Sequence, residues 1–164
     1  MKRIVDEEQG IVADIEHKTR AFFTRYERSF EGFGFEGLLD NYVTMVFKKA
    51  KLARFRDGSI RLVEGPIGRA RVWWSSRTRR AVIWECGLDK ELAEHYRLNL
   101  AKAATSIWNF VEEYLKENGV VEARVKEVEA ERFWELLGGL SSFLKLRGYQ
   151  RTSMPWIVSK ILRS

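Results

Sequence analysis

Apolar residues recur at spacings of three, four and seven along the first thirty positions of the chain, the period of one face of a helix. Asp6, Glu7 and Glu8 place negative charge where such a helix would begin. The glycine-rich run EGFGFEG at 31–37 would end it. We therefore expect an amphipathic helix over 1–31 with an apolar face made of Ile11, Val12, Ile15, Phe22, Phe23, Tyr26 and Phe30.

From about 42 to 86 the pattern changes to short runs with a period of two, which is typical of strands. Three turn signals separate these runs: Asp57-Gly58, the stretch 65–68 and the stretch 75–80. Consecutive strands joined by short turns pair antiparallel in the simplest arrangement. The segment 42–86 is therefore expected to form a four-stranded meander, with one face against helices and the other toward water.

A second helical pattern covers 89–118. Asp89 is a good N-cap, Asn118-Gly119 is a good stop, and the apolar residues between them keep a spacing of three or four. These residues are Leu92, Tyr96, Leu100, Ala103, Ile107, Val111 and Leu115. A long central helix is therefore predicted.

The rest of the chain, 119–164, is expected to be mixed and mostly helical. Alternation at Val121, Ala123 and Val125 favours a fifth strand, and a helix running on to Glu129 is the alternative. Apolar clusters on either side of Gly138-Gly139 indicate further helices, and an apolar tail at 156–158 is expected to be tied down. Together these patterns predict an α+β fold in a single domain, 1–164, with the four-stranded antiparallel meander packed on one face against long helices.

Composition narrows the class of protein. A chain of 164 residues with 45% apolar residues suffices for one core, and its single cysteine excludes an internal disulfide and fits an intracellular protein. The first ten residues carry charges where a signal peptide is apolar, and no run approaches the roughly 18 apolar residues of a membrane span. We expect a soluble, cytoplasmic protein, and the high charge content fits a hyperthermophilic source.

The positive charge is concentrated in one segment. Residues 46–80 hold eleven Lys and Arg against Asp57 and Glu64, a net charge of +9, whereas the whole chain carries +6. The remainder therefore carries −3. A local basic segment of this kind suits a polyanionic partner.

Strand alternation divides this basic segment into two sets of side chains. One set is expected to pack inward: Ala70, Val72, Trp74, Ile60 and Leu62. The other set keeps Phe55 and Trp73 among like charges, which is unusual for a face that only meets water. Aromatic rings for stacking and cations for phosphates are what single-stranded nucleic acid requires. The predicted binding residues are Lys49, Lys51, Arg54, Phe55, Arg61, Arg69, Arg71, Trp73, Arg77, Arg79 and Arg80.

Other motifs give weaker signals. The stretch 32–37 matches the dinucleotide fingerprint GxGxxG, but it follows a predicted helix where a strand is required, so no cofactor is predicted. It also echoes the aromatic motif of RNA-recognition domains, which leaves Phe33 and Phe35 as candidate stacking residues. His17, His95 and Cys86 form no catalytic or metal-binding spacing, so neither a metal site nor an enzyme is predicted.

The segments FKKAKLARFRDGSIR, RARVWW and RTRRAVIWE, between long helices, resemble the ThermoDBP family of archaeal single-stranded-DNA-binding proteins. The resemblance implies a non-enzymatic protein that binds single-stranded DNA without sequence preference and protects it in DNA replication and repair. That family dimerises through a C-terminal leucine zipper, and no sustained heptads follow Leu146 here, so a homodimer stays open. The residues alone do not separate DNA from RNA, and an RNA-binding module is an alternative.

A second resemblance points to an enzyme. The strand near Trp84, the helix from Asp89, the segment at Val121 and the ending FLKLRGYQ are similar to a degenerate N-acetyltransferase of the GNAT family. That family carries a glycine-rich R/Q-x-x-G-x-G/A turn for the pyrophosphate of coenzyme A. The corresponding residues here, 96–101, read YRLNLA and contain no glycine. This reading is therefore the alternative to nucleic-acid binding.

Overall fold

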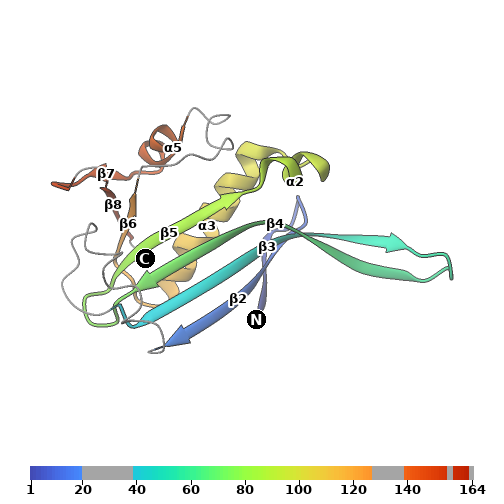
Figure 1. Ribbon diagram of the computed structural model, residues 1–164, viewed down its shortest axis with the longest axis horizontal. Coiled ribbons are helices and arrows are strands. Elements are labelled where there is room, and N and C mark those ends of the chain that lie inside the picture. Colours follow the sequence, from blue (N-terminus) through green and yellow to red (C-terminus); the bar gives the residue numbers. More distant parts are fainter. Residues whose placement is uncertain (20–38, 127–138, 155–156, 163–164) are drawn as a thin grey trace.

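A computed structural model describes residues 1–19, 39–126, 139–154 and 157–162 of the chain. All the strands described belong to one mixed sheet with the order β1-β2-β3-β4-β5-β6-β8-β7 (Figure 1). The strands are β1 Lys2–Asp6, β2 Ile11–Thr19, β3 Asn41–Arg54, β4 Ile60–Trp74, β5 Arg80–Leu88, β6 Glu122–Lys126, β7 Gln150–Arg151 and β8 Ile157–Ile161. The helices described are α2 Lys90–His95, α3 Leu100–Glu117 and α5 Leu140–Leu146.

The first nineteen residues form a β-hairpin, so the helix predicted over 1–31 is wrong there. Ile11 and Ala13 are fully buried and Ile15 nearly so, while the residues between them are only partly buried. Ile11 and Ile15 stand four positions apart, a spacing that fits one face of a helix and one face of a strand equally well. Nine paired positions with β3 decide between the two. Phe22, Phe23, Tyr26, Phe30, Phe33 and Phe35 lie outside the described residues.

Two of the three predicted turns exist, and the third is a bulge. Gly58 adopts a positive φ of 86° in the turn between β3 and β4, and residues 75–79 connect β4 to β5. The stretch 65–68 lies inside β4, where Lys48 pairs with Pro66 and Phe47 with Gly68. Ile67 is the extra residue of this bulge. The segment 42–86 therefore makes three long strands instead of four.

Helix α3 covers one face of the sheet and builds the main core. Its residues Ile107, Trp108 and Leu115 are almost fully buried against the inward side chains of β2 to β5. The predicted helix over 89–118 is divided, because the chain turns at 96–99 between α2 and α3. The strand predicted near Val121 is confirmed as β6, which runs parallel to β5.

The opposite face of the sheet, called the open face here, carries a smaller buried cluster. Leu39, Trp73, Val82 and Ile157 form this cluster. Strands β6, β7 and β8 extend the sheet beyond β5, and α5 lies at this end of the sheet (Figure 1). The predicted helices at 127–138 lie outside the described residues, as does Trp156. The predicted fold, a four-stranded meander on long helices, is thus corrected to an eight-stranded mixed sheet.

A two-stranded arm extends from the sheet. Past the bulge at Ile67, the last residues of β3 and the first of β4 continue as residues 48–66, the arm. Residues 48 and 49 still pair with β2, and the rest of the hairpin projects beyond the other strands (Figure 1). No helix among the described residues is long and apolar enough to cross a membrane.

Candidate functional site

Strands β5 and β6 separate partway along β5. They pair in parallel from Arg80 and Glu122 to Ile83 and Val125, whereas β5 continues to Leu88. Figure 1 shows β6 directed away from the far end of β5, with α3 as the connection between the two strands. Residues 84–88, called the β5 extension here, therefore lie past the last β6 pair within the described part of the chain.

A β-bulge at the start of the β5 extension sets which side chains face which way. Arg71 pairs with Glu85 and Val72 with Ile83, so Trp84 is the extra residue. In a regular strand, Glu85 would have the same orientation as Ile83, two positions earlier, and would point into the core under α3. Because of the bulge, Glu85 lies instead on the open face beside Arg71. Trp84 itself is 41% exposed.

Two guanidinium groups hold Glu85 on the open face. Arg69 Nε donates to one carboxylate oxygen at 2.7 Å, and Arg71 Nε donates to the other at 2.9 Å. Both arginines come from β4, two positions apart on one face. The pair neutralises Glu85 and orients both of its oxygens.

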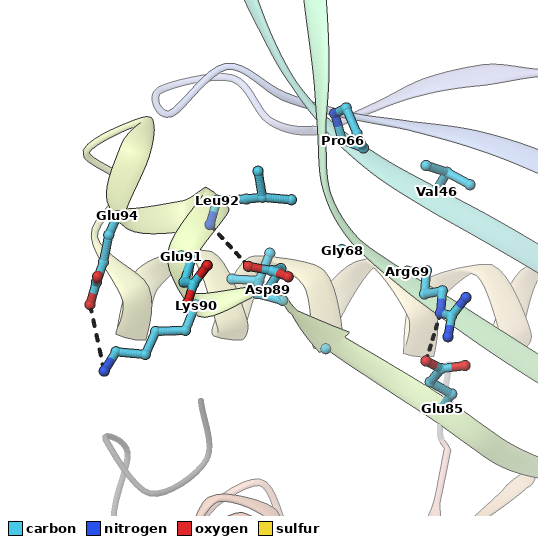
Figure 2. A pocket seen from close by; sticks show the side chains of 12 residues that line it. Val46, Pro66, Gly68, Arg69, Glu85, Asp89, Lys90, Glu91, Leu92 and Glu94 are labelled. Carbon is cyan, nitrogen blue, oxygen red and sulfur yellow. Dashed lines mark hydrogen bonds and ion pairs between the residues drawn. The ribbon is translucent and has the colours of Figure 1, made fainter. Parts of the chain in front are cut away.

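A cavity of about 910 Å³ lies next to this cluster, between the open face and α2 (Figure 2). Val46, Arg69 and Glu85 line it from the sheet. Asp89, Lys90, Glu91, Leu92 and Glu94 line it from the other side. The side-chain carboxylate of Asp89 accepts the amide of Leu92 at 3.0 Å and so caps α2. Because Glu85 is already neutralised, the net charge of the lining comes from the α2 side, where three carboxylates outnumber Lys90 and favour a positively charged group.

Side chains cover the backbone amides at the start of α3, where the sequence has no glycine. Asn99 is the N-cap, its side chain accepts the amide of Lys102 at 3.1 Å, and its own amide donates to Gln9 Oε1 at 2.9 Å. Leu98 and Leu100 pack against the core. A pyrophosphate needs exposed amides and close backbone approach. The residues 96–101 therefore do not fit the nucleotide end of coenzyme A.

A polar cluster lies among α3, α5 and β8. Glu112, only 4% exposed, accepts Arg147 Nη2 at 2.6 Å and also pairs with Lys160. Beside it the Tyr149 hydroxyl is buried and has no hydrogen-bond partner among the described residues. Burial, then the charges of Glu112 and Cys86, raise the pKa of Tyr149 well above its ordinary value. Cys86 belongs to the β5 extension, so Tyr149 lies near it.

Five of the predicted binding residues lie on the arm: Lys49, Lys51, Arg54, Phe55 and Arg61. The Arg61 guanidinium stands 4.3 Å from the centre of the Phe55 ring and also pairs with Asp57 at 2.9 Å. The Lys49 ammonium donates to the carbonyl of Gln9. Phe55 is 39% exposed. Ile60 and Leu62, which were predicted to pack inward, are 60% and 61% exposed, so this prediction is wrong.

The predicted stacking residue Trp73 is buried. It is 4% exposed and stacks on Tyr42 with ring centres 4.1 Å apart. Trp74 lies on the other face, in the main core, as the alternation predicted together with Ala70 and Val72. The expectation that Trp73 is exposed is therefore wrong, because the small cluster on the open face covers it.

Of the remaining predicted residues, Arg69 and Arg71 pair with Glu85, and the other three lie far from the arm. Arg77 and Arg79 are exposed in the turn after β4, and Arg80 pairs with Glu122 at 3.1 Å. Between Arg61 and the turn that holds Arg77 the chain runs along nearly the whole of β4, a span of about 43 Å at ~3.3 Å per residue. The structure therefore does not bring the predicted residues into one track.

Sequence reasoning missed two residues of this region. Glu85 resembles a surface carboxylate in the sequence, since only the bulge at Trp84 decides its orientation. Tyr149 lies among charged and polar residues in the stretch 145–152, which in the sequence is typical of an exposed loop, so nothing there indicates its burial.

The chain was compared with known proteins. No protein-family profile matches it, and no curated protein is similar to it in sequence. Among solved structures it is similar to Tetrahymena GCN5, with 10% identity over 74% of this chain and 69% of that one and a TM-score of 0.46. It is also similar to a putative N-acetyltransferase from Lactobacillus plantarum, with 14% identity over 92% and 99% of the two chains and a TM-score of 0.45.

A third similar structure is the PaiA N-acetyltransferase of Thermoplasma acidophilum in complex with coenzyme A. It is 16% identical over 73% of this chain and 59% of that one, with a TM-score of 0.42. At these TM-scores the likeness carries no inference about substrate or mechanism.

These findings correct the reading of the chain as a ThermoDBP-like protein. The similar structures are N-acetyltransferases of the GNAT type, and none of the comparisons supports binding to DNA or RNA. The predicted role in replication and repair, the nucleic-acid partner and the expectation of a non-enzyme are withdrawn with it. The alternative reading, similarity to GNAT N-acetyltransferases at low sequence identity, is the one that the comparisons favour.

Proposed function

We propose that this chain is an N-acyltransferase that binds a thioester along the β5 extension and transfers its acyl group to an amine. The observation that carries the proposal is the end of the β5–β6 ladder at Ile83 and Val125. In open sheets, ligands bind outside the carboxyl ends of parallel strands, and β5 and β6 are the parallel neighbours of the described sheet.

The proposed donor has an extended chain with amide groups, as acyl-pantetheine has. Such a chain can continue the hydrogen-bond ladder that β6 leaves at Val125, because backbone amides of a strand recognise an added extended chain. Cys86 and Leu88 of the β5 extension are buried, so the donor would lie against a well-packed strand. Since residues 96–101 do not fit a pyrophosphate, we derive no contact with a nucleotide.

Tyr149 supports the chemical step. A tyrosine hydroxyl is protonated at neutral pH, and that of Tyr149 is buried without a hydrogen-bond partner among the described residues, so a thioester sulfur placed beside it would be the acceptor of its proton. The amine nitrogen forms a C–N bond with the acyl carbon, the C–S bond breaks, and the sulfur takes the Tyr149 proton. The nitrogen releases its extra proton to water, from which Tyr149 is protonated again.

The cavity beside Glu85 supports a cationic amine as the acceptor. Glu85 is neutralised by Arg69 and Arg71, but on the α2 side three carboxylates stand against Lys90 alone. They are Asp89, Glu91 and Glu94. An amine that carries a second positive group would be attracted there. We also propose, as the sequence predicts, a single domain over 1–164 that acts in the cytoplasm, where a chain with one cysteine stays reduced.

The donor class is tested by calorimetry with acetyl-coenzyme A and acetyl-pantetheine. We expect both to bind, with dissociation constants within about threefold of each other, because the turn at 96–101 offers the nucleotide end no contact that would add affinity. Failure of both thioesters to bind would contradict the proposed function.

Turnover is tested by thiol release from the bound thioester with a panel of diamines. Tyr149→Phe should lower kcat by about 10² to 10⁴-fold while KM changes little, the usual size of a general-acid contribution. The control is Tyr114→Phe, another buried tyrosine, on α3 against Trp74. Equal turnover in the two variants would mean that the Tyr149 hydroxyl takes no part.

A further inference from the structure

Helix α2 rests at both ends on the bulged part of β4. At its start the amide of Asp89 donates to the carbonyl of Ile67, the extra residue of the bulge, at 2.8 Å. At its end Tyr96 is the C-cap, and the tip of its ring lies against the backbone of Gly65. The same part of β4 contributes Pro66 to the wall of the cavity (Figure 2). The bulge is therefore the support on which α2 is mounted.

The missing side chain at Gly65 makes room for the tyrosine. A Cβ at this position would stand 1.8 Å from the hydroxyl oxygen of Tyr96 and 2.7 Å from its Cζ. The backbone of Gly65 is not in the left-handed region, so its own conformation does not require glycine. The contact with Tyr96 is what requires glycine here.

The residue after Tyr96 has a strained backbone. Arg97 adopts a φ of 55°, in the left-handed region, which a residue with a Cβ keeps only where its surroundings enforce it. Its amide donates to the carbonyl of Glu94 at 3.0 Å and so closes the last turn of α2. The chain thus accepts backbone strain in the turn that places the Tyr96 ring against Gly65.

Helix α2 carries the charge that an acceptor amine would meet. It has six residues, too few to hold a position without tertiary contacts. Glu91 and Glu94 line the cavity from α2, and Glu85 lines it from the sheet. A shift of α2 would therefore move two carboxylates relative to the β5 extension.

We propose that Gly65 and Tyr96 are positioning residues that determine the acceptor specificity of the cavity. They hold α2 where Glu91 and Glu94 attract the second positive group of a diamine while its first amine reaches the β5 extension. Both residues act through α2 and not through contact with the acceptor. This proposal rests on the acyl-transfer function proposed above.

Thiol release with 1,5-diaminopentane and with pentylamine tests the proposal, because the two probes differ only in the second amine. In Gly65→Ala the added methyl group must displace the Tyr96 ring. KM for the diamine should then rise at least about fivefold, the upper range for a surface ion pair. KM for pentylamine, and kcat with either amine, should stay within about twofold. A partly unfolded variant would change both amines alike.

The tyrosine is tested with a conservative pair of variants. Tyr96→Ala removes the ring and should raise the diamine KM as Gly65→Ala does, whereas Tyr96→Phe keeps the ring against Gly65 and should behave like the wild type. Gly58→Ala adds a methyl group at the open tip of the same hairpin and is the control. Equal ratios of diamine KM to pentylamine KM in the wild type and Gly65→Ala would overturn the proposal.

Calorimetry with 1,5-diaminopentane alone separates this proposal from the acyl-transfer proposal. With no thioester present, the wild type should bind the diamine and Gly65→Ala should bind it at least about fivefold more weakly. This result in a protein that binds no thioester would support the role of Gly65 and contradict acyl transfer. A wild type that binds thioesters but not the diamine would overturn the role of Gly65 and leave acyl transfer standing.

Discussion

At the scale of single residues, charge and burial depend on neighbours that are distant in sequence. The +9 of residues 46–80 is counted without Glu85 and Glu122, which lie outside that window. The fold sets Glu85 against Arg69 and Arg71, and Glu122 against Arg80. These two carboxylates lower the net charge of the segment from +9 to +7, so the basic segment is neutralised within the protein only in part.

Tyr149 gives a prediction at this scale. An unfolded tyrosine loses its proton near pH 10, whereas burial and the charge of Glu112 keep Tyr149 protonated above that pH in the folded protein. The folded state therefore binds more protons there, and stability falls as pH rises above about 10. Between pH 9 and 11, a range centred on the ordinary tyrosine pKa of ~10, the free energy of unfolding should fall less for Tyr149→Phe than for the wild type. Urea titrations at the two pH values measure this difference.

At neutral pH the same variant should be slightly more stable. Its removal of a buried hydroxyl without a partner should raise the free energy of unfolding by about 1 kcal/mol. A lower free energy of unfolding for Tyr149→Phe would mean that the hydroxyl is satisfied in the native state.

At the scale of elements, two bulges position the site. The bulge at Ile67 starts the arm, and the bulge at Trp84 turns Glu85 to the open face. Neither leaves a clear signal in the alternation of apolar residues. In the first case the glycines and proline of 65–68 look the same in a turn and in a bulge.

Gly68 gives a prediction for these elements. A Cβ at Gly68 would lie 2.2 Å from the carbonyl oxygen of Gly87, so β4 and β5 must move apart in Gly68→Ala. We expect a loss of about 3 kcal/mol in the free energy of unfolding, measured in urea, the upper range for overpacking. Gly58→Ala is the control: its Cβ meets nothing, and only the positive φ costs about 1 to 2 kcal/mol. An equal loss in both would show that the strands tolerate the added methyl group.

At the scale of the whole molecule, the arm and the body are separate in what they bury. The core lies between α3 and the inward faces of the strands, whereas the large aliphatic residues of the arm stay exposed. Folding of the body should therefore not depend on the outer arm.

Shortening the arm tests this separation. In a variant that joins Lys51 to Val63, which are paired across the two strands, through Asn-Gly, the free energy of unfolding should stay within about 0.5 kcal/mol of the wild type. A cooperative loss of stability would place the outer arm in the folding unit of the body.

The sequence by itself determined the local features of this protein. The turn at Asp57-Gly58, the caps at Asp89 and Asn118, strand β6 and the alternation of Ala70, Val72 and Trp74 follow from contacts between near neighbours, which the sequence contains.

Tertiary structure decided the rest. Ile11 and Ile15 fit a helix or a strand until β3 pairs with them, and Trp73 is a stacking residue or a buried one according to what covers the open face. The separation of β5 from β6 and the burial of Tyr149 depend on elements more than thirty residues apart in the chain. Such contacts are set by long-range packing, which leaves no periodic signal in the sequence.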